Sequence, residues 1–214
     1  MADIRTAIVT GGHSFDVIGF HALFRALDGV DPYIQHMEDF IAAPDAVRDS
    51  YDVIVLFTHF KGAEYEQPTF ARVEPIFEHL ATTQQGILAL HHGLLAYPDW
   101  PLWDAIIGMT ERRLTRYSHD ETISLQVADP DHPITARVAN WTMIDETYMI
   151  HDAPAENHVL LTTDHPDSFK TLAWTRQYNQ HRVFCLSSGH DDQTWVDPNF
   201  RRVLHQGIQW CAGR

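Results

Sequence analysis

The sequence predicts an α/β fold in which helices cover both faces of a mainly parallel sheet. Three observations predict it: short apolar runs alternate with helix-like segments, several runs end on histidine or glycine, and the spacing matches βαβ units. Strands joined in this way by helices make right-handed crossovers and lie parallel. Their carboxyl ends share one edge of the sheet, where open α/β sheets bind ligands.

The first half of the chain shows this pattern most clearly. Apolar residues recur at helical spacing in the segment after Ser14 and again from about Thr69 to Thr82, and a further short segment opens at Pro44. Short apolar runs bounded by turn residues separate these segments and are expected to be buried strands. The predicted strands are Arg5–Thr10, Tyr33–Met37, Val53–Phe57 and Ile87–Leu90.

The second half is less regular, although its last helix is the clearest of the chain. That helix has Asp197 as its N-cap and Pro198 at its first position, and it stops at Gly213. An earlier helix is predicted over Leu102–Ile107 and ends at Gly108. The predicted strands are Ile123–Val127, Met143–Tyr148, Val159–Thr163, Thr171–Tyr178 and Arg182–Leu186, the last two closed as a hairpin by Asn179–Gln180.

The composition fits one domain spanning residues 1–214, without repeats or linkers. A formal charge of −14, with 15 Lys and Arg against 29 Asp and Glu, argues against nucleic acid or an anionic membrane surface as the main partner. A neutral or cationic small molecule is easier to accommodate. Both cysteines, Cys185 and Cys211, lie in apolar runs and are expected to be buried. No leader-like segment precedes the first strand, so we expect a cytoplasmic protein.

Two imidazoles and a glycine follow the buried run Ile87–Leu90. The segment containing His91, His92 and Gly93 has the layout of a nucleophile elbow, a sharp turn that exposes one side chain at the top of a sheet. Histidine in the exposed position can act as a general acid, a general base or a metal ligand. The alternative is that both rings only hydrogen-bond the loop backbone.

Further candidates occur at other strand ends. His190 is followed by two carboxylates, which can fix the tautomer of an imidazole and raise its basicity. Glu146 and Tyr148 are two residues apart on a predicted strand and share a face, whereas Asp145 faces the other way. Other expected contributors to the pocket are His13 and His59 after earlier strands, Asp191 and Asp192 after His190, and Trp100 with its neighbouring aromatic residues.

The motifs together resemble the ThuA-like, or trehalose utilisation, family over nearly the whole chain. Each motif is short, but their order and spacing make the match specific. They are Thr10-Gly11-Gly12-His13, Leu90-His91-His92-Gly93, Trp100-Pro101-Leu102-Trp103 with Gly108, His132-Pro133-Ile134-Thr135, Asp145-Glu146-Thr147-Tyr148, Ser188-Gly189-His190-Asp191, Phe200-Arg201-Arg202 and Gly207-Ile208-Gln209-Trp210.

This resemblance implies a three-layer flavodoxin-like sandwich of the class I glutamine amidotransferase type. In such amidotransferases the elbow carries a cysteine, which is paired with a later histidine and an acid two residues further on. Here His91 occupies the elbow, while His190 and Asp192 resemble the later pair. Without the thiol, glutamine hydrolysis is not expected. The family's association with disaccharide and oxidised-sugar catabolism implies a carbohydrate-derived substrate.

Our first hypothesis is therefore an enzyme that acts on a sugar or keto-sugar by acid–base chemistry, with or without a divalent metal such as Zn²⁺ or Mn²⁺. A metal-dependent hydrolase and a non-catalytic sugar-binding or regulatory module remain alternatives. The Gly11-Gly12 pair is too short for a phosphate-binding loop, so no nucleotide cofactor is expected. We also expect a homo-oligomer. The predicted roles are catalytic for His91, His190, Glu146 and Asp192, substrate-binding for His13, His92, Tyr148, Trp100, His59 and Asp191, and metal-binding for His91, His190 and His13.

Overall fold

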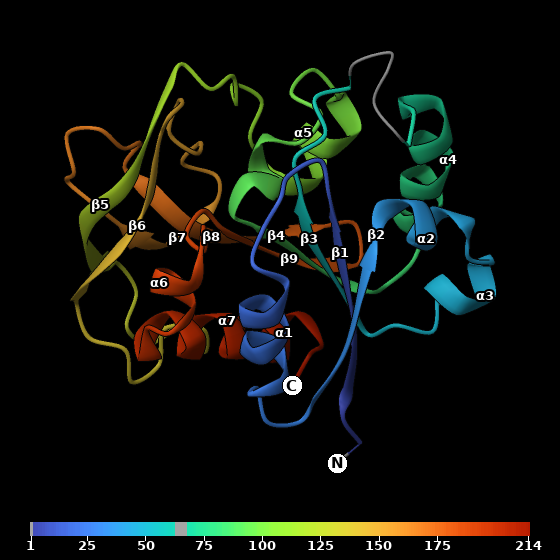
Figure 1. Cartoon of the computed structure of the whole chain (residues 1–214), viewed down its shortest axis with the longest axis horizontal. Coiled ribbons are helices and arrows are strands. Elements are labelled where there is room, and N and C mark those ends of the chain that lie inside the picture. Colours follow the sequence, from blue (N-terminus) through green and yellow to red (C-terminus); the bar gives the residue numbers. More distant parts are fainter. Residues whose placement is uncertain (1, 63–67) are drawn as a thin grey trace.

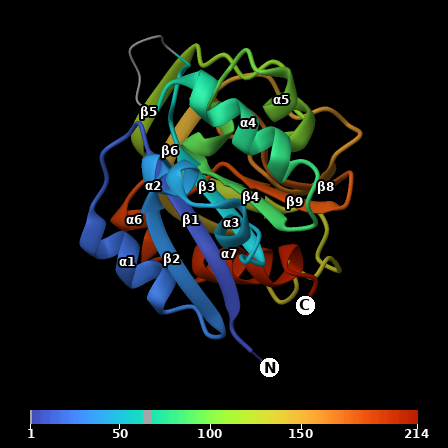
Figure 2. The same ribbon diagram turned by 90° about the vertical axis from the view of Figure 1, so that its right-hand side faces the viewer.

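The computed structural model describes residues 2–62 and 68–214, and its described strands form one nine-stranded sheet with helices on both faces (Figure 1). The strand order is β2-β1-β3-β4-β9-β8-β7-β5-β6. Figure 2 shows the layers: α4 and α5 lie on one side of the sheet, and α1 and α7 lie on the other. The predicted α/β class and the three layers are therefore confirmed.

Half of the sheet is parallel, as expected from the crossovers in the sequence. It comprises β2 (Val30–His36), β1 (Ile4–Gly11), β3 (Val53–Thr58), β4 (Gly86–Leu90) and β9 (His181–Leu186). Every residue of β3 and β4 is buried, because helices cover both faces. The carboxyl ends of these strands consequently meet at one edge.

The other half is antiparallel, which corrects the prediction of a mainly parallel sheet. It comprises β8 (Thr171–Tyr178), β7 (His158–Thr162), β5 (Arg116–Val127) and β6 (Trp141–Met149). The predicted hairpin joins β8 to β9 with Tyr178 opposite His181, and Asn179 adopts a φ of 49° in the turn. The turn between β8 and β9 is too short to hold the helical crossover that parallel pairing needs.

Helices of both layers pack on the centre of the sheet. α7 (Pro198–Cys211) begins with the predicted Asp197 cap, whose carboxylate accepts hydrogen bonds from two backbone N–H groups, and it contacts β4 and β9. α5 (Pro101–Ile107) contacts β9 and β8 on the opposite face. The remaining helices are α1 (Val17–Arg25), α2 (Met37–Ala42), α3 (Asp45–Arg48), α4 (Phe70–Leu80), α6 (Asp192–Trp195) and the 3₁₀ helix η1 (His91–Leu95). Among the described residues no helix is long and apolar enough to cross a membrane.

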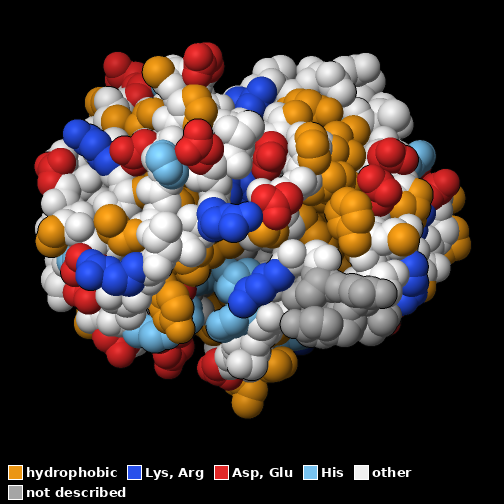
Figure 3. Space-filling view, turned by 90° about the horizontal axis from the view of Figure 1, so that it is seen from above, with side chains coloured by type: hydrophobic (Ala, Val, Ile, Leu, Met, Phe, Trp, Pro, Cys, Tyr) orange, Lys and Arg blue, Asp and Glu red, His pale blue; other side chains and the backbone are white. Residues whose placement is uncertain are grey.

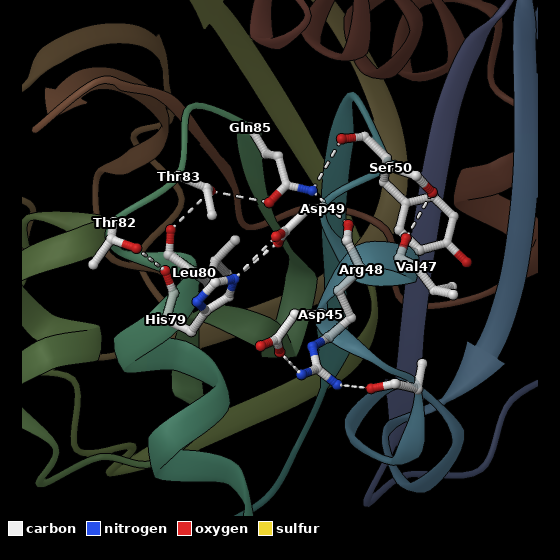
Figure 4. A network of polar contacts seen from close by, with 12 residues as sticks. Asp45, Val47, Arg48, Asp49, Ser50, His79, Leu80, Thr82, Thr83 and Gln85 are labelled. Atoms are coloured by element: carbon white, nitrogen blue, oxygen red, sulfur yellow. Dashed lines mark hydrogen bonds and ion pairs between the residues drawn. The ribbon is translucent and has the colours of Figure 1, made fainter.

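A polar network fixes the start of β4 (Figure 4). Gln85 immediately precedes that strand and donates hydrogen bonds to the backbone oxygens of Arg48, at 2.7 Å, and Tyr51, at 2.9 Å. His79 of α4 contacts the Asp49 carboxylate at 2.9 Å in the same region. The network anchors the amino end of β4, and its carboxyl end is thereby held in register beside β3 and β9.

Candidate active site

The sharp turn after β4 has the predicted elbow conformation. His91 lies in the left-handed region at φ 52° and is fully buried, and the chain continues directly into η1. A Cβ atom on Gly93 would lie only 2.2 Å from the backbone oxygen of Leu56, so glycine is required for η1 to approach β3 this closely. A strained backbone at the end of a central strand is common at functional sites.

The backbone of the β9 end fixes the tautomer of His91. Its Nδ1 atom lies 2.8 Å from the carbonyl oxygen of Ser187, and because a carbonyl only accepts hydrogen bonds, Nδ1 must carry a proton. In the neutral ring the Nε2 lone pair is then available. It faces Glu146 Oε2 at 3.1 Å, His190 Nδ1 at 3.2 Å and the Tyr148 hydroxyl at 2.7 Å.

Glu146 and His190 complete a compact buried centre with His91, which we call the His–Glu–His centre. Glu146 Oε2 is 3.3 Å from His190 Nδ1. Burial alone would raise the pKa of Glu146, but hydrogen bonds from His190 and from the protonated form of His91 hold it well below its usual range. The bond to Glu146 raises the pKa of His190, and burial followed by the Glu146 charge raises the pKa of Tyr148. An anionic carboxylate, an easily protonated imidazole and a neutral phenol therefore meet at one point.

Asp145 holds the loop that carries His190. Its carboxylate is 2% exposed and accepts hydrogen bonds from the backbone N–H groups of Gly189, at 2.9 Å, and His190, at 3.0 Å. Strand alternation sends Asp145 to this loop while Glu146 and Tyr148 enter the site, as their spacing predicted. Asp145 thus positions the His190 ring through the backbone.

His119 of β5 is a member of the site that the sequence analysis missed. Its Nδ1 atom lies 3.3 Å from Glu146 Oε1, and its ring centroid lies 4.7 Å from that of His190. β5 has a register shift between Ser118 and Glu121, and Asp120 between them has a φ of 56°. The shift interrupts the alternation that marks a strand, so only the regular part from Ile123 was predicted. Extending that strand back across the irregularity would have placed His119 beside β6.

Three further histidines lie next to the centre. His92 is 2% exposed, its ring stacks on that of His59 at 5.5 Å, and its centroid is 4.8 Å from that of His13. Neither ring nitrogen of His92 has a hydrogen-bond partner of good geometry among the described residues. Burial lowers the pKa of all three rings, well below the usual value for His92 and to about 4 for His59, where Lys61 contributes. Near neutral pH these rings are uncharged.

Glu146 and Tyr148 connect the centre to a cleft of about 600 Å³ at the carboxyl edge of the parallel strands, whereas His91 and His190 are not among its described lining residues. Figure 3 looks onto this edge and shows histidine side chains gathered in a hollow bordered by Lys and Arg. Glu146 is the one carboxylate among its described lining residues. They are Gly12, His13, His59, Lys61, His92, Leu95, Pro98, Arg112, Arg113, Leu114, Tyr117, His119, Glu146 and Tyr148.

Four of the predicted site residues do not belong to the His–Glu–His centre. Asp192 is exposed in the first turn of α6, and the carboxylate that contacts His190 is Glu146. Asp191 caps α6 by accepting a hydrogen bond from the Gln193 N–H at 3.0 Å. Trp100 is buried against the aromatic rings of α4 and is not among the described lining of the cleft. His13 lines the cleft but is not in the ligand-like cluster, where Glu146 takes its place.

Comparisons with known proteins agree with this architecture. The family model described as ThuA, trehalose utilisation, matches residues 35–211. A ThuA-like protein of Parabacteroides merdae is similar in structure, with a TM-score of 0.72 and 18% identity over 98% of this chain and 90% of that one. A glutamine amidotransferase of Thermotoga maritima shares the fold at a TM-score of 0.62 and 9% identity, over 100% of both chains. A cytoplasmic protein of Salmonella typhimurium gives a TM-score of 0.65 and 14% identity over 96% of this chain and 98% of that one. No curated protein sequence matches the chain.

Proposed function

Because the chain belongs to the ThuA family of trehalose utilisation proteins, we propose that it is an enzyme of carbohydrate catabolism acting on a sugar or keto-sugar by proton transfer. The observation that carries the proposal is the buried His–Glu–His centre, which opens into a cleft large enough for a small ligand. The groups at this centre differ in proton affinity, and such differences separate the acid from the base in an active site.

Each group has a role in keto-sugar enolisation. The Nε2 atom of His91, with its tautomer held by Ser187, removes a proton from the carbon next to the carbonyl. Protonated His190 and the neutral Tyr148 phenol donate hydrogen bonds to the carbonyl oxygen, where negative charge develops. Glu146 keeps its charge and stabilises the imidazolium forms of both histidines. Each well-placed acid or base contributes about 10²–10⁴-fold to the rate.

Thiol-dependent glutamine hydrolysis does not fit this chain. Both cysteines are buried in the core, Cys185 against the backbone of Ile107 and Cys211 against that of Ile87. Burial raises the pKa of both thiols, so neither is an activated thiolate. The elbow position belongs to His91, which supports proton transfer in place of acyl transfer.

Proton exchange in heavy water tests the proposal directly. The protein is incubated in D₂O with keto-glucose derivatives and keto-disaccharides, and deuterium at the carbon next to the carbonyl is followed by proton NMR. We expect exchange or turnover that falls by at least about 100-fold in His91→Gln and Glu146→Gln. Asp192→Asn is the matched control and should keep wild-type activity, because Asp192 is exposed outside the cleft. Binding without exchange or turnover in the wild-type protein would overturn the proposal and favour a sugar-binding module.

The same three side chains also support a metal-dependent variant of this function, including hydrolysis. His91 Nε2, Glu146 Oε2 and His190 Nδ1 form a nearly equilateral triangle with sides of 3.1, 3.2 and 3.3 Å. These separations are close to those between neighbouring ligand atoms of a tetrahedral zinc site, so the three side chains could hold such an ion. Two imidazoles and a carboxylate leave at least one position open for water or substrate. The Nδ1 bond of His91 to Ser187 is the outer contact expected of a metal-bound histidine.

Metal analysis separates the two variants. Protein purified without a histidine tag is analysed for bound metal before and after incubation with Zn²⁺ or Mn²⁺. The metal-dependent form of the proposal predicts one bound ion per chain in the wild-type protein and in Asp192→Asn. It predicts that Glu146→Gln and His190→Gln lose the ion. Wild-type protein that takes up no ion and is not stabilised by added metal contradicts that variant, while turnover in the same sample would leave the acid–base proposal standing.

A further inference from the structure

A second cavity lies outside the cleft, between α5, β8 and the end of α7. We call it the α5–β8 pocket; its volume is about 870 Å³, larger than that of the cleft. We propose that this pocket binds a sugar at a site separate from the His–Glu–His centre, and that its occupancy is communicated to the His91 segment through Asp104 and Arg112. This second site goes beyond the function proposed above.

The lining of the α5–β8 pocket has the two kinds of surface that a sugar needs. Trp210, Met109 and Pro101 supply apolar surface for the C–H groups of a ring. Asp104 and Asn157 line the same cavity and supply planar polar groups for hydroxyls. A mostly apolar hollow with a few oriented polar groups is the usual form of a small-molecule site. The mixture of donors and acceptors suits neutral hydroxyls better than a single charge.

Arg176 provides a binding group whose bonding is incomplete. Its Nε atom is buried and has no hydrogen-bond partner among the described residues. A buried donor left without a partner costs about 1–3 kcal/mol, so an acceptor that reaches it is favoured. Gly108, at φ 74°, brings the backbone so close that a Cβ there would collide with the guanidinium of Arg176. Arg176 also lines the pocket, so its guanidinium can donate to a ligand oxygen there.

Motifs that the cleft does not use converge on this pocket. Pro101, Gly108, His132 and Trp210 belong to three of the motifs that carried the family resemblance, and these motifs are far apart in the sequence. All four line the α5–β8 pocket. The acid–base chemistry proposed above assigns none of them a role. Their convergence points to a second ligand site assembled by the fold.

Asp104 connects the pocket to the active site. It lines the pocket, and its Oδ1 atom accepts a hydrogen bond at 2.9 Å from Nε of Arg112, which is 1% exposed. The Arg112 guanidinium also donates to the backbone oxygens of Leu94, at 2.7 Å, Ala96, at 2.7 Å, and Tyr97, at 2.9 Å. These residues directly follow His91 and His92 on the same segment. A hydroxyl that competes for Asp104 changes how Arg112 holds that segment, and the coupling must act equally in both directions.

A binding experiment on a cleft variant tests the second site. In His190→Gln the His–Glu–His centre is altered, while the α5–β8 pocket keeps every lining residue. Trehalose and glucose are titrated into this variant and followed by calorimetry and tryptophan fluorescence. We expect binding to survive, and to weaken by at least 10-fold when Arg176→Gln is added. Ala105→Trp provides a second disruption, because Ala105 is exposed on α5 and a larger side chain there fills the pocket without removing core contacts.

Arg113→Gln is the matched control, since Arg113 lines the rim of the cleft and is exposed. This change should leave sugar binding to the α5–β8 pocket unaltered. The proposal is overturned if His190→Gln binds neither sugar, or if binding persists unchanged in both pocket variants. It is also overturned if turnover depends on sugar concentration in the same way in Ala105→Trp as in the wild-type protein. Turnover in the absence of any pocket binding would refute the second site and leave the proposed function intact.

Discussion

Removing the Asp145 carboxylate is expected to destabilise the fold and to displace His190. The carboxylate is 2% exposed and accepts hydrogen bonds of 2.9 and 3.0 Å from the N–H groups of Gly189 and His190. Hydrogen bonds to a charged group contribute about 1.5–3 kcal/mol each, or about 3–6 kcal/mol for two. The substitution also removes the unfavourable burial of a charge, and this offsets part of the loss. We therefore expect Asp145→Ala to lower the free energy of unfolding by about 2–4 kcal/mol.

The assay is urea unfolding together with a thermal melt. For a chain of this length, a loss of 2–4 kcal/mol corresponds to a fall in Tm of about 4–16 °C. Glu146→Gln is the matched control, because the neighbouring residue faces the cleft and glutamine keeps its volume; we expect less than half of the loss seen for Asp145→Ala. Turnover should fall in both variants for different reasons. An Asp145→Ala protein that melts within about 2 °C of wild type would refute this account of the loop.

Three further changes probe the elbow, the histidine cluster and the aromatic core. Gly93→Ala should cost at least about 3 kcal/mol or prevent folding, because its Cβ would lie 2.2 Å from the Leu56 oxygen; a wild-type urea midpoint would contradict the close approach. The pKa of His59 is about 4 in the folded protein, against an ordinary value of 6.5. Between these two pH values the unfolded chain binds a proton at His59 that the folded protein does not bind. The free energy of unfolding therefore falls as the pH drops from about 6.5 to 4. After allowance for its partial exposure this amounts to about 1–2 kcal/mol at pH 5, and the difference in Tm between pH 7 and pH 5 should shrink in His59→Asn. Trp100→Phe should lower stability by about 1–2 kcal/mol with no change in KM, and a raised KM with unchanged stability would return Trp100 to the substrate site.

The parallel half of the fold could be predicted because its inner strands, β1, β3, β4 and β9, are buried on both faces. Such strands are continuous apolar runs, and the residue after each run must leave the sheet at its carboxyl edge. On this basis the sequence predicts His13, His59 and His91 at one edge, although they are distant in sequence; His13 and His59 line the cleft, and the buried His91 ring lies beside that of His92, which also lines it. A short local pattern is enough to predict that these residues lie close together, because the carboxyl ends of parallel strands meet at one edge of the sheet.

The antiparallel half carries no comparable signal. β5 is mostly exposed, and the irregularity at Asp120 breaks its alternation, so neither its pairing with β6 nor the approach of His119 could be read from spacing. The family resemblance predicts Asp192 as the acid because it follows His190 by two residues. A helix begins at that point and turns its carboxylate away, while Glu146 reaches the same imidazole from β6. Asp192 is thus close to His190 in the sequence, but Glu146 is the carboxylate that contacts it in the structure.

The two halves of the sheet contribute different chemical functions to the site, and this division explains how an imidazole at the elbow becomes useful. The parallel half supplies His91 and His190 on rigid strand ends, and the antiparallel half supplies the Glu146 carboxylate and the Tyr148 phenol. A lone imidazole at an elbow would rotate freely and adopt either tautomer. Here Ser187 fixes one nitrogen, and the other meets Glu146, so the ring has one tautomer and one direction of proton transfer. The antiparallel half is thus required for the acid–base function, and a variant that loosens β6 from β5 should lose turnover before it loses the parallel core.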